Sequence, residues 1–338
     1  MSRGLQRYIL VRIGLTLPMV LILVSLVFIV LRVLPGDPAL AILREGASEE
    51  TLAAFRAAVG IDRPLYVQYF DFIAGVLTLD FGESMTRNRP VVEEIKTFFP
   101  ATVELAMFSM LITATIGIGF GAYAAKNRKS GTDYGIRVSS IILYSIPIFW
   151  LGLMFQMIFG AGLGWLPVSG RLDPGNTPAY TITGLYTIDA IIMRDWDLLV
   201  DALRHLILPS LTLGLILGAI FIRLTRANMV DVLEEDYITA GRARGLRERT
   251  LAYRHGLRNA FIPIVTLLGL QFALLLSGAI LTETTFSWPG MGRLIVDRIY
   301  DRDFATVQGS IVFFALLVMG ASLIVDIAYG FIDPRIRY

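Results

Sequence analysis

Residues 105–125 read LAMFSMLITATIGIGFGAYAA, a run of 21 residues without a charged side chain. The hydrocarbon core of a bilayer is roughly 30 Å thick, and a helix needs about 20 apolar residues to cross it. Apolar residues occupy every face of this stretch rather than one stripe, which is typical of a membrane span and not of an amphipathic surface helix. The run therefore predicts a transmembrane helix.

Five further charge-free runs follow the same pattern and indicate an all-α polytopic membrane protein with six transmembrane helices. They occupy residues 13–31, 138–170, 206–222, 259–282 and 304–325. Only the first two thirds of the long 138–170 run are expected to be helical. The first run also has features of a signal peptide, but its 19 apolar residues exceed the usual 7–15, so we expect an uncleaved span.

The composition argues against several other classes of protein. Of the 338 residues, 55% are hydrophobic and 17% are charged, against about 25% charged in average soluble domains. The mean hydropathy of +0.65 agrees with this deficit and argues against a soluble enzyme or a disordered chain. The absence of cysteine excludes disulfides and thiolate chemistry, and two histidines are few for a metal site. A net charge of +2 is too small for a general nucleic-acid binder.

The placement of lysine and arginine predicts the orientation in the membrane. With a cytoplasmic N-terminus, the inner segments hold 17 of the 30 basic residues in 68 residues, whereas the outer segments hold 13 in 135. The outer segments also contain 19 of the 28 acidic residues. Because basic residues concentrate in cytoplasmic loops, both termini are expected in the cytoplasm.

The outer segment 32–98 is long enough to contain its own helices. Ser48 followed by two glutamates predicts a helix N-terminus, and Gly60 predicts its end. A second short helix is expected at 66–77, and another at 187–193 in the outer loop 161–204. The 32–98 segment either contacts a partner or only shields the first span, and the residues do not decide between these two roles.

Residues 223–258 form the one long inner segment and carry eight arginines, five acidic residues and no lysine. Residues that fit one helix face recur at 230, 233, 237 and 240, and again at 246, 250, 253 and 257. The pattern predicts two short amphipathic helices joined at Gly245, where glycine allows a left-handed turn. Arginine suits contacts with protein carbonyls and carboxylates. A protein-docking surface is therefore favoured over the alternative, a basic loop held on anionic lipid.

The segment from Glu235 to Leu246 has the sequence EDYITAGRARGL, and residues 254–260 continue it with RHGLRNA. Together these residues resemble the coupling loop of permease subunits of ABC importers, in particular the dipeptide/oligopeptide (peptide/nickel) branch of the binding-protein-dependent transport family. Gly245 and Leu257 stand at the Gly and Leu positions of the importer motif. The chain departs from the general motif at Thr239, Gly241, His255 and Arg258, as members of the peptide branch do.

Further motifs extend the resemblance over almost the whole chain. They are LPGDP at 34–38, YSIPIFW at 144–150, PVSG at 167–170, GAILTETTFSWPGMGR at 278–293 and DPRIR at 333–337. The resemblance implies the type I ABC importer permease fold. It divides the chain into an N-terminal span with its outer helical segment (1–97), a transmembrane domain (98–331) with coupling helices at about 230–257, and a cytoplasmic tail (332–338).

The same resemblance implies roles for individual residues. Coupling to an ATPase subunit would fall on Glu235, Asp236, Tyr237, Thr239, Ala240, Gly241, Arg244, Gly245, Leu246, Arg247 and Leu257. An outer gate, or a contact with a solute-binding protein, would fall on Glu283, Thr284, Phe286, Trp288, Pro289 and Gly290. For Trp288 taken alone, an anchor at the lipid headgroups is the favoured interpretation, because tryptophan prefers that level.

A peptide carries charges that are costly to place in lipid, so its pathway needs polar or water-accessible groups. Neutral candidates within the spans are Ser109, Thr113, Tyr144, Ser145, Gln156, Gln271 and Ser277. Many hydroxyls in helices instead bond to their own backbone, so each of these remains an open candidate. Gly117, Gly119 and Gly121 are expected to form a close helix-packing seam.

The chain has no phosphate-binding loop, and its only lysines are Lys96, Lys126 and Lys129. No catalytic residue, metal ligand or cofactor of its own is predicted. The resemblance implies that one or two partner subunits bind ATP and Mg, that a second homologous permease completes the pathway, and that an extracytoplasmic solute-binding protein delivers a peptide. The expected location is the bacterial or archaeal inner membrane.

Alternative functions remain at this stage. The same class of transporter could carry a nickel chelate or another small solute. An ion-coupled secondary transporter would need an ion site at the midplane, where no acidic residue is evident. An intramembrane enzyme would need paired acids, a Ser/His dyad or metal ligands, and no such motif occurs.

Overall fold

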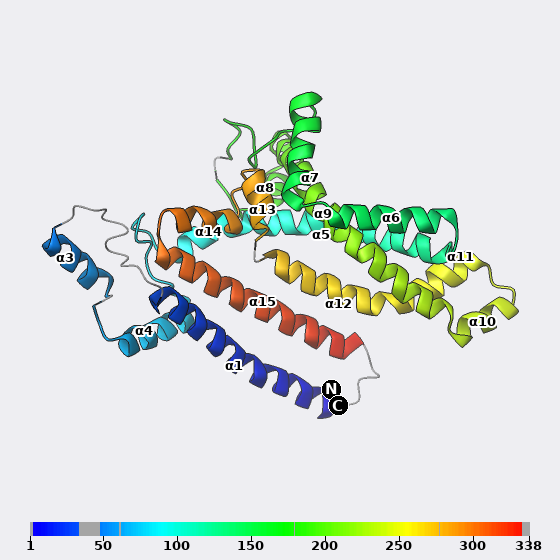
Figure 1. Cartoon of the computed structure of the whole chain (residues 1–338), viewed down its shortest axis with the longest axis horizontal. Coiled ribbons are helices and arrows are strands. Elements are labelled where there is room, and N and C mark those ends of the chain that lie inside the picture. The colour runs from blue at the N-terminus through cyan, green and yellow to red at the C-terminus, as the bar shows by residue number, and fades with distance from the viewer. Residues whose placement is uncertain (1–2, 34–47, 61, 179, 277, 333–338) are drawn as a thin grey trace.

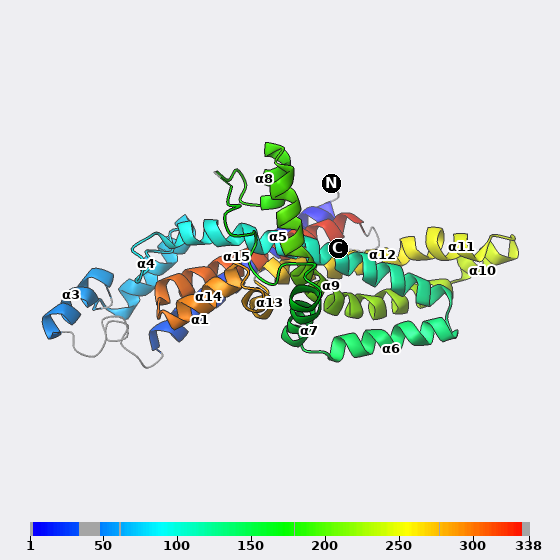
Figure 2. The same ribbon diagram turned by 90° about the horizontal axis from the view of Figure 1, so that it is seen from above.

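The computed structural model describes residues 3–33, 48–60, 62–178, 180–276 and 278–332. Within these residues the chain is helical and has no strand, which confirms the predicted fold class; extended backbone pairs only at a bridge between Glu83 and Pro90. The helices form an elongated bundle. Helix α3 (Glu49–Val59) lies at one end and α10 (Asp236–Ala243) at the other, as both Figure 1 and Figure 2 show.

Four stretches of the described chain are helical, long and apolar enough to cross a membrane. They are α5 (Val91–Lys126), α9 (Trp196–Leu233), Glu248–Leu276 and the Phe304–Ile324 part of α15 (Phe304–Ile332). The described apolar stretch of α1 (Arg3–Val33), Gly14–Val30, is shorter. A bent helix pair brings the number of spans to five, so the predicted total of six is not confirmed.

The bent pair replaces the single third helix expected within 138–170. Helix α6 (Gly131–Ser145) ends before Pro147, and α7 (Ile148–Phe155) continues through the π-helix η1 (Gln156–Gly162) at an angle of 98° to α6. Ile146 is extended, with φ −80° and ψ 129°, because the proline ring disfavours a helical conformation in the preceding residue. The expectation of a single helix within the 138–170 run is therefore wrong at this position.

The second inner helix predicted after Gly245 is not a separate element. It begins with α11 (Glu248–Thr250), passes through the π-helix η2 (Leu251–Gly256) and continues into α12 (Leu257–Leu276). Glu248–Leu276 thus forms one helical stretch that includes the fifth predicted span. The inner segment is consequently joined to the membrane part without a loop.

The outer helices follow the predicted capping residues. Ser48 accepts a hydrogen bond from the Thr51 amide at the start of α3, and Gly60 adopts the left-handed conformation at its end. Helix α4 (Leu65–Thr78) follows and packs on α1 through a cluster that includes Val24, Val27 and Val76. The structure thus contains the predicted 49–59 helix, and the 66–77 helix is longer by one residue at each end.

The centre of the bundle is the pair α5 and α9, against which α6, α12 and α15 pack (Figure 1). Three shorter helices lie on the side predicted to be outer: α8 (Tyr186–Met193), α13 (Ile280–Thr285) and α14 (Met291–Tyr300). Near α10, buried apolar side chains of α9, α10, η2 and α12 form one cluster. With Ala122 and Ala125 of α5, this cluster connects the predicted coupling segment to three spanning helices.

Candidate functional site

The predicted coupling segment forms a compact projection at the end of the bundle, which we call the inner knuckle (residues 234–247). Ile238 is fully buried, and Gly241 packs so closely that an added Cβ would lie 2.7 Å from Leu251 Cδ2. The opposite face of α10 is open, with Tyr237 44% exposed. One face of the knuckle is therefore packed against the bundle, and the opposite face is exposed.

The turn after α10 depends on Gly245. Its φ of +78° is left-handed, a conformation that glycine adopts without strain. The Gly245 amide donates to Arg242 O and the Leu246 amide donates to Gly241 O, which closes the end of α10. Leu246 is left 43% exposed beside this turn. The predicted break at Gly245 is thus a tight helix ending that places an apolar side chain in the open.

The structure divides the predicted coupling residues into two groups. The exposed ones are Glu235, Asp236, Tyr237, Thr239, Ala240, Arg244, Gly245, Leu246 and Arg247. Gly241 and Leu257 instead pack inward, Leu257 against the cluster that joins α9, η2 and α12. In addition, Asn259 of α12 donates a hydrogen bond of 2.6 Å to the Tyr237 hydroxyl. These inward contacts connect the exposed face to α12.

Most residues of the predicted outer-gate segment are buried. The Glu283 carboxylate, 0% exposed, accepts hydrogen bonds from the Thr102 hydroxyl at 2.8 Å and the Arg293 amide at 3.0 Å. Burial raises the pKa of Glu283, against the effect of these donors. Glu283 therefore joins α13 to the start of α14 and to α5. The role of Glu283 in an outer gate or in a contact with a solute-binding protein stays a prediction.

Trp288 is a core residue and not a headgroup anchor. It is 1% exposed, and its indole Nε1 donates to Ala101 O on α5 at 2.8 Å. Phe286 and Gly290 are buried as well, Pro289 is half-buried and Thr284 is exposed. The anchor interpretation of Trp288 is wrong because the 286–292 turn folds back onto α5 instead of following α12 outward.

Two buried ion pairs close to this segment were not predicted. Arg171 Nη2 donates to Glu104 Oε2 at 2.6 Å, and its guanidinium lies 3.8 Å from the centre of the Tyr186 ring. Arg298 makes two hydrogen bonds, of 2.8 and 3.0 Å, to the Glu94 carboxylate. Glu104 and Arg171 directly border the charge-free runs 105–125 and 138–170, which was the available signal for the first pair. The pairing itself could not be predicted, because the two residues of each pair are 67 and 204 positions apart in the chain.

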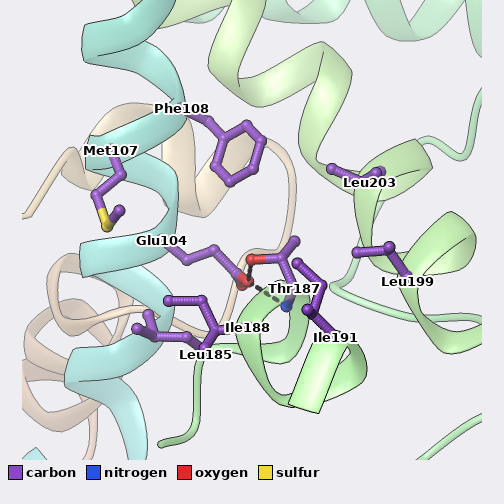
Figure 3. Close-up of a pocket in the computed structure, with 9 residues that line it drawn as sticks. All are labelled: Glu104, Met107, Phe108, Leu185, Thr187, Ile188, Ile191, Leu199 and Leu203. Carbon is purple, nitrogen blue, oxygen red and sulfur yellow. Dashed lines mark hydrogen bonds between the residues drawn. The ribbon is translucent and has the colours of Figure 1, made fainter. Parts of the chain in front are cut away.

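An apolar cavity of about 320 Å³ lies beside Glu104. Figure 3 shows Glu104 directed toward Thr187, whose amide and hydroxyl both donate to Glu104 Oε1 at 2.7 Å. The remaining lining is apolar: Met107, Phe108, Leu185, Ile188, Ile191, Leu199 and Leu203. Because its polar atoms are already paired, this cavity suits an apolar group and not a charged peptide end.

The candidate pathway residues do not lie on one face. Ser109 and Thr113 are fully buried on the α9-facing side of α5, and Thr113 donates to Gly214 O at 3.4 Å. Tyr144 and Ser145 are exposed at the end of α6, although the Ser145 hydroxyl bonds to Ile141 O. The other candidates are Gln156, whose amide donates to Val168 O and Thr285 O, the half-buried Gln271, and Ser277, which lies outside the described residues.

Within the described residues, one cluster of side chains could hold a metal ion, although no metal site was predicted. It contains Asp173, Asp201 and His205, whose ligand atoms lie within 4.8 Å of one another. His205 Nδ1 lies 3.0 Å from Asp201 Oδ1, and Asp201 Oδ2 already accepts from Asn176 Nδ2 and from the Asp173 amide. These contacts join the 171–176 loop to α9.

Comparison with known proteins places these features in a family. Residues 117–338 match the family described as binding-protein-dependent transport system inner membrane component, and residues 5–106 match the corresponding N-terminal family. The chain is 43% identical over 331 residues to the di/tripeptide transport system permease protein DppB of Pseudomonas aeruginosa (strain UCBPP-PA14), with 97% of each chain covered.

Other relatives are similar over a comparable length. The dipeptide transport system permease protein DppB of Escherichia coli (strain K12) is 40% identical over 98% of this chain and 99% of its own length. The glutathione transport system permease protein GsiC of Salmonella typhi is 39% identical, also over 98% and 99%. With the apolar helices, these matches show that the chain belongs to the family of multi-pass inner membrane components of binding-protein-dependent transport systems.

Proposed function

We propose that this chain is the permease subunit of an ATP-driven importer of short peptides. Family membership supports a transport role, and the names of the relatives supply the cargo class, since they include dipeptide, di/tripeptide and glutathione permeases. Glutathione is itself a peptide-like solute, so a peptide backbone with a free carboxylate is the common chemistry. A nickel chelate is the alternative cargo within the same class.

The observation that carries the mechanism is the attachment of the inner knuckle to several spans at once, α9 and α12 among them. Ile238 of α10 lies in the same buried cluster as Met229 and Leu233 of α9 and Ile264 of α12. A force on the exposed face of α10 therefore moves α9 and α12 together, because a close-packed core transmits displacement. This is the arrangement that coupling to an external motor requires.

The motor would be one or two partner ATPase subunits, which bind ATP and Mg in place of this chain. They would dock on the exposed knuckle residues, and ATP would favour one state of the permease through its different affinity for the two states. The exposed face of the knuckle would lie in the cytoplasm, and both termini would lie on the same side of the membrane. The 1–97, 98–331 and 332–338 divisions remain the proposed domain limits.

This chain would form half of the pathway, and a second homologous permease the other half. The buried segment Glu283–Gly290 would close the outer side, and the solute-binding protein would dock over it. Thr284 is the exposed residue of this segment and so the proposed direct contact. Opening would then require Glu283 to exchange its buried hydrogen bonds for others.

Replacing Leu246 with aspartate tests the coupling role. Leu246 is exposed, so the variant should fold and insert, yet a carboxylate there would oppose docking of an apolar partner surface. We expect ATP hydrolysis stimulated by loaded binding protein, measured in proteoliposomes, to fall at least tenfold. Gly245→Trp should have the same effect, because it adds bulk at a left-handed position.

Gly131→Asp is the matched control for this experiment. It adds the same charge on the same side of the molecule, at the first residue of α6, where nothing lies within 4 Å of a new Cβ. An acidic residue is favourable at a helix N-terminus, so hydrolysis should be unchanged. Normal stimulated hydrolysis in Leu246→Asp would contradict the assignment of the knuckle as the docking site.

A further inference from the structure

Arg223 places a positive charge at the inner end of an apolar span. It directly follows the charge-free run 206–222 of α9, and its side chain is exposed on the surface of the chain. The guanidinium carbon lies 4.8 Å from the centre of the Tyr144 ring on α6, and Tyr144 is 52% exposed. The two side chains thus form a cation–π pair on an open face.

The pairing of α6 with α9 indicates how deep this pair lies. Arg226, one turn after Arg223, binds Asp133 at the start of α6 through contacts of 2.6 and 2.8 Å. Tyr144 lies eleven residues beyond Asp133 on α6, which corresponds to roughly 16 Å of helix. Arg223 therefore extends in the opposite direction to Arg226, from the inner end of the 206–222 run toward the middle of the bundle.

Arg223 also lacks an acidic partner among the residues that the structure describes. The neighbouring Arg226 and the buried Arg171 and Arg298 each bind a carboxylate. No described carboxylate oxygen lies within 4.0 Å of the Arg223 guanidinium. Its only described partner is the Tyr144 ring, which holds one face of the guanidinium and leaves the N–H groups at the edge free.

A charged side chain that extends along the apolar part of a span is costly in lipid, and such residues commonly face the bundle interior or a water-filled cavity. Because the side chain is on the surface of the single chain, we place this water-filled space between the chain and the second permease of the proposed assembly. Tyr144, a residue that the sequence already suggested for the pathway, lies on the same surface. The pair is therefore positioned along the route of the cargo.

We propose that Arg223 and Tyr144 form a carboxylate-binding site on the translocation pathway, where the guanidinium binds the C-terminal carboxylate of a passing peptide. The inference rests on the proposed function as a peptide permease. A guanidinium binds a carboxylate through two parallel hydrogen bonds, and Tyr144 keeps its plane fixed. The contact recognises a group common to all free peptides and ignores their side chains. The exposed position allows release.

Import by the complete transporter in proteoliposomes tests the site. Arg223→Gln should lower the initial rate for a dipeptide about tenfold at subsaturating peptide, the size expected for losing a charge-assisted hydrogen-bonded pair. Arg223→Lys should keep most of the rate. For the same dipeptide with a C-terminal amide, the initial import rate should differ less than twofold between Arg223→Gln and the unaltered transporter. Lys96→Gln, which removes an exposed charge from α5, is the control and should leave import of both peptides unchanged.

The absence of cysteine permits a second test of the same site. In Arg223→Cys, a water-soluble methanethiosulfonate should reach the introduced thiol from the pathway. Attachment of an aminoethyl group, which restores a positive charge, should recover dipeptide import, whereas a neutral methyl group should not. This comparison of positive and neutral attachments uses only the free dipeptide. It therefore does not require the binding protein to deliver the amidated peptide.

Three results would overturn the site. They are an unreactive thiol at position 223, an equal loss of rate for the dipeptide and its amide, and altered ATP hydrolysis by Arg223→Gln without any peptide. The last result would indicate an ion pair with the second permease. Failure of the proposed function is distinguishable from all three, because the unaltered transporter would then import no peptide.

Discussion

Individual buried charges hold the outer part of this chain together. Asp303, immediately before α15, accepts hydrogen bonds from the Met85 amide at 3.1 Å and from the hydroxyls of Ser84, Thr86 and Thr306. Burial opposes ionisation of this carboxyl, but these donors hold the pKa of Asp303 below its usual value. A single side chain thus fastens the 84–86 loop to the start of the last span.

Asp303→Asn should destabilise this junction by about 1–3 kcal/mol, since the charge that strengthens five hydrogen bonds is lost. The measurement is thermal unfolding of the purified chain in detergent. Asp297→Asn, which alters an exposed carboxylate 3.7 Å from Arg293, should have almost no effect. Equal unfolding temperatures for Asp303→Asn and the unaltered chain would show that the junction does not depend on this charge.

The depressed pKa of Asp303 also predicts a pH dependence with a definite sign. Because the folded state favours the ionised form, the stabilisation is complete above the unfolded pKa of about 3.9 and is lost as the pH falls through the lower folded value. The difference in stability between the unaltered chain and Asp303→Asn should therefore shrink on acidification.

At the scale of helices, close approach of α5 and α9 determines the centre of the bundle. A Cβ added to Gly117 would lie 2.4 Å from Phe221 Cβ, and one added to Gly121 would lie 2.6 Å from Thr225 Cβ. Nothing lies within 4 Å of a Cβ added to Gly119. Only the two glycines four residues apart therefore belong to the seam, because residues at that spacing share a helix face.

Gly121→Val should separate α5 from α9 and destabilise the chain, by about 1–3 kcal/mol for an overpacked contact. Gly119→Val makes the same substitution on the open face and should leave the unfolding temperature nearly unchanged. Melting of both variants in the same detergent provides the comparison. A larger loss in Gly119→Val than in Gly121→Val would contradict the assigned seam.

For the whole molecule, the opposite ends of the bundle should lie on opposite sides of the membrane. Helix α3 and the inner knuckle occupy these two ends in both views (Figure 1, Figure 2). Glu50→Cys in α3 should react with a membrane-impermeant maleimide in right-side-out vesicles. Arg244→Cys in the knuckle should react only after permeabilisation. Labelling of Arg244→Cys in sealed vesicles would reverse the proposed orientation and remove the basis for ATPase docking.

Much of the architecture could be predicted from the sequence because the signals are local. A charge-free run long enough for a bilayer predicts a helix, as in α5 and α9, and Ser48, Gly60 and Gly245 mark helix ends through their own backbone requirements. The exposed face of α10 was also predictable, since the spacing of apolar and charged residues along one helix is a local property of the sequence.

By itself, the amino-acid sequence determined the helical class, four of the apolar spans, the family and the position of the inner knuckle. The tertiary structure alone decided that Glu283 and Trp288 are buried, that Glu104 binds Arg171, and that Arg223 meets Tyr144. Each of these depends on two segments far apart in the chain becoming neighbours. Periodicity records which residues share a face of one helix, but which faces meet is settled only when the helices pack.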